Sequence, residues 1–168
     1  MNGGESAYSP SGPGRADRAG SHVEDPELHA AGPDPLRLAR PALHELAAAT
    51  HHDMPGLVPL ALAALARERP GAILWVAGGG AWREHGAPFA PGLLRMGIDP
   101  GRLLLARARK PLDALAAVEE GLLSGAVAAV VGEVTEAGFT ATRRLALAAG
   151  RHGVPAVLGF PPARAGST

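Results

Sequence analysis

The chain has 168 residues, no net charge and no cysteine, and only 4% of its residues are aromatic. This length fits one domain, and the lack of cysteine excludes disulfides, thiol catalysis and cysteine-ligated zinc. The abundance of alanine, leucine and valine favours helices packed tightly on a small parallel sheet.

Residues 1–35 are rich in glycine, serine, proline and aspartate and show no apolar period. They hold two arginines and six acidic residues, which gives this segment a net charge of −4. Such a segment cannot bury enough apolar surface to offset the entropy of ordering, so we expect a disordered acidic tail. We expect a flexible C-terminus over residues 163–168.

Residues 36–162 alternate apolar runs with segments of helical spacing, which predicts one α/β domain. Strands are predicted at 43–46 (LHEL), 72–77 (AILWVA), 102–108 (RLLLARA), 126–131 (AVAAVV) and 154–159 (VPAVLG). Helices are predicted from about Leu57 to Arg69, from Pro111 to Gly125 with a stripe of Leu112, Leu115, Val118 and Leu122, and from an N-cap at Thr140 to about Gly150. Apolar strands that alternate with helices are typical of a mostly parallel sheet covered on both faces, so the predicted fold is three-layer α/β.

The fourth apolar run, GAVAAVVGEV at 125–134, has Glu133 near its end. Many nucleotide-hydrolysing α/β proteins present the acid that organises magnesium at the end of such a strand. Such an acid is useful in nucleotide hydrolysis only if a phosphate-binding loop faces it. That loop needs converging backbone N–H groups and a lysine followed by serine or threonine. Lys110 is the chain's one lysine and is followed by proline, while the glycines at 78–80 lack the dinucleotide-binding spacing. We therefore expect no cofactor and no enzymatic activity.

Two groups of charged side chains remain as candidate sites. The possible metal ligands are His44, Glu45, His51, His52 and Asp53, but their spacing and their loop setting do not favour a metal site. The basic candidates for partner contacts are Arg143, Arg144 and Arg151 on one helix, and Arg107, Arg109 and Lys110 at a strand end. A solvated helix face is the alternative reading for the first three.

The order of these segments resembles the core of the RecA recombinase fold. More narrowly, the chain resembles the ImuA family, RecA-like bacterial proteins of a damage-inducible mutagenesis cassette. The resemblance covers about Pro41 to Leu158 and is carried by LHEL, ILWV, DALAAVEEGLLSGAVAAVVGEV and TATRRLALAA. It places the Walker B aspartate of RecA-like ATPases at Glu133 and their catalytic glutamate near Gly78. Residues 36–162 are thus identified as a degenerate RecA-like domain, a pseudo-ATPase.

The resemblance implies a non-enzymatic accessory or scaffold protein of SOS-induced, error-prone translesion DNA synthesis. The implied partners are ImuB, a catalytically inactive homologue of Y-family polymerases, together with RecA and an error-prone replicative-type polymerase. Contact with DNA would be indirect. The implied location is the cytoplasm, at the nucleoid when active, and no membrane is involved. Family members usually continue past the last predicted strand, so we expect a relative shortened at its C-terminus.

Two other functions are compatible with the same residues. One is a small nucleotide-binding protein or enzyme that uses His51, Gly78 and Glu133 at one edge of the sheet. The other is direct DNA binding through Arg143 and Arg144, which predicts a steep salt dependence.

Overall fold

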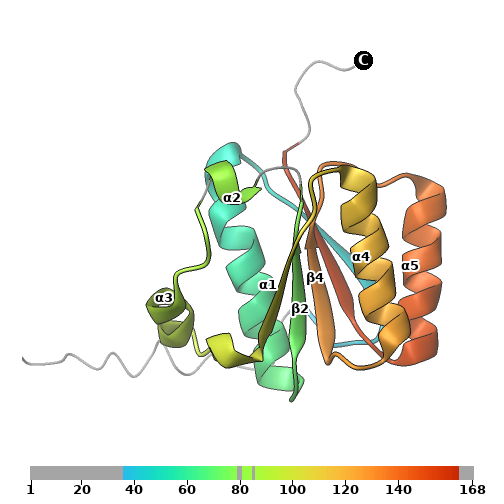
Figure 1. Cartoon of the computed structure of the whole chain (residues 1–168), viewed down its shortest axis with the longest axis horizontal. Coiled ribbons are helices and arrows are strands. Elements are labelled where there is room, and N and C mark those ends of the chain that lie inside the picture. Colours follow the sequence, from blue (N-terminus) through green and yellow to red (C-terminus); the bar gives the residue numbers. More distant parts are fainter. Residues whose placement is uncertain (1–35, 79–80, 85, 163–168) are drawn as a thin grey trace, which may run out of the picture. The chain divides into compact units, whose positions relative to one another are not determined.

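The computed structural model describes residues 36–78, 81–84 and 86–162, and within them five strands form one sheet (Figure 1). The strand order is β1-β5-β4-β2-β3, and every neighbouring pair is parallel. The strands are β1 (Leu43–Ala47), β2 (Ile73–Ala77), β3 (Leu103–Arg107), β4 (Ala129–Glu133) and β5 (Ala156–Phe160). The helices are α1 (Met54–Glu68), α2 (Ala81–Glu84), α3 (Ala90–Arg95), α4 (Pro111–Ser124) and α5 (Phe139–His152), with 3₁₀ turns η2 (His51–Asp53) and η3 (Pro100–Arg102).

Helices cover both faces of the sheet, which confirms the predicted three-layer α/β fold. Helix α1 packs on one face against β4 and β5, while α4 and α5 pack on the other (Figure 1). Successive side chains of a strand point to opposite faces, so neighbours in β4 serve different layers. Val131 joins the apolar core beneath α1, whereas Val130 joins the core beneath α4 and α5.

The predicted first residues of one helix and one strand are each wrong by three positions. Helix α1 begins at Met54 and not at Leu57, since Pro55 is tolerated in a first turn, where a missing N–H breaks no helical hydrogen bond. Strand β4 begins at Ala129 and not at Ala126, because its neighbour β2 begins level with Ala129. Pairing between strands, which the local pattern does not contain, sets that boundary.

The limits of α5 also differ from the prediction. Its N-cap is Gly138, and Thr140 lies inside the first turn. The helix runs to His152, beyond the predicted end at Gly150, and Gly153 with φ of 68° closes it. Left-handed backbone of this kind is where glycine commonly ends a helix.

Helix α4 begins at Pro111 and ends before Gly125 as predicted, but one member of its apolar stripe is wrong. Leu112 is 77% exposed. At 100° per residue it lies roughly 90° from the centre of the buried stripe. The buried members are Leu115, Val118 and Leu122.

The short helices α2 and α3 lie between β2 and β3, where the sequence pattern predicts neither. Helix α2 follows the glycines at 78–80 almost directly, of which Gly79 and Gly80 lie outside the described residues, as do 1–35 and 163–168. None of the helices in the described part of the chain has the length and apolar character needed to cross a bilayer.

Candidate functional site at the carboxyl edge of the sheet

The carboxyl ends of β2, β3 and β4 lie side by side, because neighbouring strands are parallel and in register. Ala77, at the end of β2, pairs with Arg107 of β3 on one side and with Glu133 of β4 on the other. Ligands of open α/β sheets bind outside this edge. A ligand-binding site is therefore expected at the carboxyl edge of this sheet.

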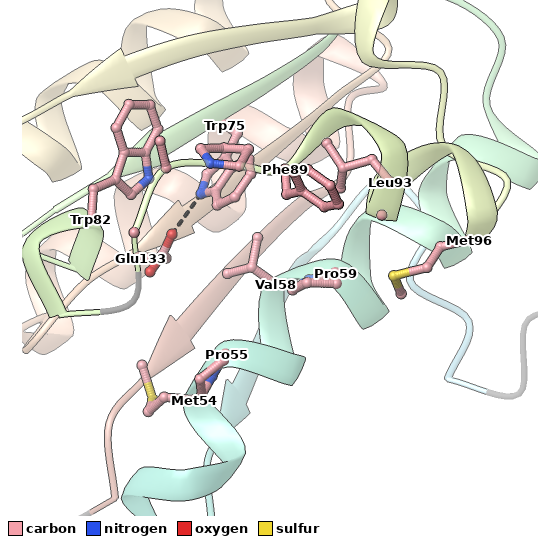
Figure 2. Close-up of a pocket in the computed structure, with 14 residues that line it drawn as sticks. Met54, Pro55, Val58, Pro59, Trp75, Trp82, Phe89, Leu93, Met96 and Glu133 are labelled. Carbon is pink, nitrogen blue, oxygen red and sulfur yellow. Dashed lines mark hydrogen bonds between the residues drawn. The ribbon is translucent and has the colours of Figure 1, made fainter.

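Glu133 is the one charged residue found buried among the described residues, with a relative exposure of 8%. It lies two residues after Val131 and so faces the α1 side of the sheet, as does Trp75, the strand neighbour of Val131. The Trp75 indole Nε1–H donates a hydrogen bond of 2.7 Å to Glu133 Oε1 (Figure 2). A buried carboxylate needs such donors, because desolvation without them is costly.

Gly78 lies near the position where the RecA resemblance places a catalytic glutamate, and no side chain fits at residue 78. Its N–H donates to the main-chain oxygen of Glu133 at 3.1 Å. A Cβ at this position would lie 2.4 Å from that oxygen and 3.2 Å from Ala114 Cβ. The close approach of β2 to β4 thus excludes a catalytic side chain at residue 78.

Aromatic rings surround the buried carboxylate. Trp82 of α2 meets Trp75 edge to face, with 6.0 Å between ring centroids and an interplanar angle of 76°. The Arg107 guanidinium lies 5.2 Å from the Trp82 ring centroid, within cation–π range. Trp82 Nε1 is buried and, within the described part of the chain, has no hydrogen-bond partner. An unsatisfied buried donor costs about 1–3 kcal/mol.

A cavity of about 280 Å³ opens beside these rings, and we call it the edge cavity (Figure 2). Its walls come from α1, α2, the segment 86–96 and the ends of β2 and β4, and they include Met54, Val58, Trp75, Trp82, Phe89 and Glu133. Among the described lining residues, Glu133 is the one ionisable side chain. The edge cavity is therefore suited to an apolar group and not to phosphate, which a carboxylate repels.

The histidine-rich loop does not gather around the edge cavity or around a metal position. His51 and His52 are exposed in η2, and the Asp53 carboxylate caps this turn by accepting from the N–H and the hydroxyl of Thr50, each at 2.8 Å. The His44 ring contacts the Arg40 carbonyl oxygen at 3.2 Å. In the described ranges, no three histidine or acidic side chains stand close enough together to hold a metal ion.

The two predicted basic groups lie at different places in the fold. Arg143, Arg144 and Arg151 are exposed on α5, on the face of the sheet opposite α1. Arg144 donates from Nε to Glu119 Oε1 of α4 at 3.1 Å, so part of its charge is compensated. Arg107 is the last residue of β3, and Arg109 and Lys110 follow it; all three are exposed. Arg107 lies against Trp82, which lines the edge cavity.

The edge cavity was not predicted from the sequence, although one signal for it is present there. The chain has only three phenylalanines, two tryptophans and one tyrosine, and both tryptophans and Phe89 line this cavity. Half of a small aromatic content thus converges on one site. Arg102 was also missed: it donates to the carbonyl oxygens of Gly71 at 2.8 Å and Ala66 at 2.9 Å, and thereby ties η3 to the end of α1.

Comparison with known proteins identifies relatives over the same segments. No family model matches the chain. Protein ImuA of Caulobacter vibrioides, from strain NA1000 / CB15N and from strain ATCC 19089 / CIP 103742 / CB 15, is 36% identical over 115 residues, which is 66% of this chain. The chain belongs to the ImuA family. It spans 45% of the length of these ImuA relatives, so the match concerns one part of them.

A solved structure also resembles the fold of this ImuA family member. The crystal structure of SulA from Pseudomonas aeruginosa superposes with a TM-score of 0.53, covers 71% of this chain and 97% of its own, and is 24% identical. At that identity the likeness concerns the α/β fold alone. The predicted family and fold class are both confirmed.

Proposed function

We propose that this chain is a non-enzymatic accessory protein of SOS-induced, error-prone translesion DNA synthesis and acts by binding protein partners. Membership of the ImuA family supports the pathway. The structural observation that carries the non-enzymatic role is the missing space at Gly78, where a Cβ would stand 2.4 Å from a main-chain oxygen. The fold is retained, while residue 78 has no room for a catalytic side chain.

The expected partners are an ImuB-like inactive polymerase homologue, RecA and an error-prone replicative-type polymerase. Exposed arginines on α5 and the basic group at the end of β3 offer two surfaces for acidic partners, on different sides of the sheet. Contact with DNA would then be made by the partners. The protein would act in the cytoplasm, at the nucleoid during the damage response.

Co-purification tests this proposal directly. The full chain is mixed with the ImuB-like protein, RecA and the error-prone polymerase of its own organism, one at a time, and complexes are separated by size-exclusion chromatography. A stable complex with at least one partner is expected. Charge reversals at Arg143 and Arg151, against reversals at Arg109 and Lys110, would show which basic group is used. Folded protein that forms no complex with any of them would contradict the proposal.

Binding of a nucleotide is the result that would replace the proposed accessory role with the nucleotide-binding alternative. Titration with millimolar ATP and Mg²⁺ in a calorimeter is expected to give no heat of binding, because the described lining of the edge cavity offers a carboxylate and apolar groups to the phosphates. A saturable signal that Glu133→Gln abolishes would instead favour the nucleotide-binding function.

A further inference from the structure

We propose that the edge cavity is a docking site for an acidic segment of a partner protein, whose apolar side chain enters the cavity. This inference rests on the proposed function, in which the chain acts through protein partners, and it names the surface and the chemistry. Two features of the described residues carry it: an apolar mouth and positive charge beside the opening.

The mouth of the edge cavity exposes large apolar side chains. Phe89 is 71% exposed and Met96 is 46% exposed, and both line the cavity. Leu94, on the same short helix as the cavity residue Leu93, is 60% exposed. Exposed apolar side chains are therefore present both at the mouth of the cavity and on α3. Exposed aromatic and methionine side chains around a pocket are typical of the centre of a protein interface.

Basic side chains beside the edge cavity favour acidic residues on either side of the apolar anchor. Arg107 stacks on Trp82, and Arg109 and Lys110 follow in the next three residues, all of them exposed. The N–H of Ala108 donates to the Ala77 carbonyl at 2.9 Å, which holds this basic loop at the same edge of the sheet as Gly78. Asp113 is the acid that follows in the chain, so the segment 107–113 carries an excess of positive charge. Acidic residues beside the apolar anchor would pair with this basic group.

The experiment uses the full chain and a defined probe, a random dodecapeptide library displayed on phage. Selection on the unmodified chain is followed by removal of clones that also bind Ala87→Trp, since Ala87 is an exposed lining residue where a large ring would fill the cavity. Enriched peptides are then synthesised with a fluorophore, and their affinity is measured by fluorescence polarisation. We expect an apolar anchor and a net negative charge in the enriched peptides.

Matched variants make the affinity measurements decisive. Phe89→Ala and Arg107→Glu are each expected to weaken binding by about tenfold or more, as truncation of an interface anchor does. Phe139→Ala on α5 and Arg40→Glu ahead of β1 are expected to change affinity by less than about twofold, because both positions are exposed and lie outside the cavity lining. Circular dichroism and melting temperature establish that each variant is folded.

Three results would overturn the inference: no peptide that distinguishes the unmodified chain from Ala87→Trp, an enriched set without acidic bias, or equal binding by Phe89→Ala. These results would leave co-purification with the whole partners unaffected, and with it the proposed function. Conversely, peptides that bind as expected while no whole partner co-purifies would support the docking site and contradict the named partners.

Discussion

Replacing Gly78 by alanine tests the claim that the sheet edge has no room for a side chain. The added Cβ would stand 2.4 Å from the Glu133 main-chain oxygen, about 1 Å inside the 3.4 Å at which ordinary contact begins. Relief requires β2 and β4 to separate at their ends, which weakens the 3.1 Å hydrogen bond between Gly78 N–H and that oxygen. Overpacking costs about 1–3 kcal/mol and a lost hydrogen bond about 0.5–1.5 kcal/mol, so a loss of about 1.5–4.5 kcal/mol is expected.

The assay is urea denaturation of the full chain, followed by tryptophan fluorescence and circular dichroism. Gly150→Ala is the matched control: it lies in α5 with nothing within 4 Å of its added Cβ, and should raise the free energy of unfolding by about 0.5–1 kcal/mol. The two substitutions add the same methyl group, and only its surroundings differ. A Gly78→Ala protein within about 0.5 kcal/mol of the unmodified chain would refute the steric argument and reopen the site to a catalytic side chain.

Three further outcomes follow from other contacts. Trp75→Phe removes the donor to the buried carboxylate and should cost about 1.5–3 kcal/mol in urea denaturation, whereas Trp82→Phe removes an unpartnered N–H and should cost at least about 1 kcal/mol less; equal losses would contradict this contrast. Arg102→Lys should cost about 1–3 kcal/mol, since lysine lacks the fork that reaches several carbonyls, while Arg143→Lys should be neutral in the same assay. Arg144→Ala should change the free energy of unfolding by less than about 1 kcal/mol, because its side chain is 63% exposed, and a larger loss would show that the ion pair with α4 supports the fold.

Local sequence was enough to predict the elements whose signals are self-contained. A proline at the start of a helix and a glycine after it are read without knowing the fold, and both limits of α4 agree with that reading. The alternation of apolar strands with helices likewise predicted a parallel sheet with two covered faces. Boundaries of β4, α1 and α5 were wrong. The start of β4 depends on strand register, and the start of α1 on a tolerated proline.

Some features of the candidate site could likewise be predicted from the sequence, and others could not. The absence of a phosphate-binding lysine and the position of Glu133 at a strand end are properties of the sequence. That Glu133 is buried and held by Trp75, 58 residues away in the chain, follows only from the pairing of β2 with β4. The edge cavity depends on α2 and α3, short helices whose signals are weak because four to six residues hold little periodicity.

The sequence by itself thus determined the fold class, the family and the missing chemistry of a phosphate site, because each rests on residue types and their order. Only the tertiary structure decided where the scarce aromatic side chains meet, why residue 78 is a glycine, and which basic group borders a cavity. Those features arise from contacts between segments far apart in the chain, and their distances are set by the parallel register of the sheet.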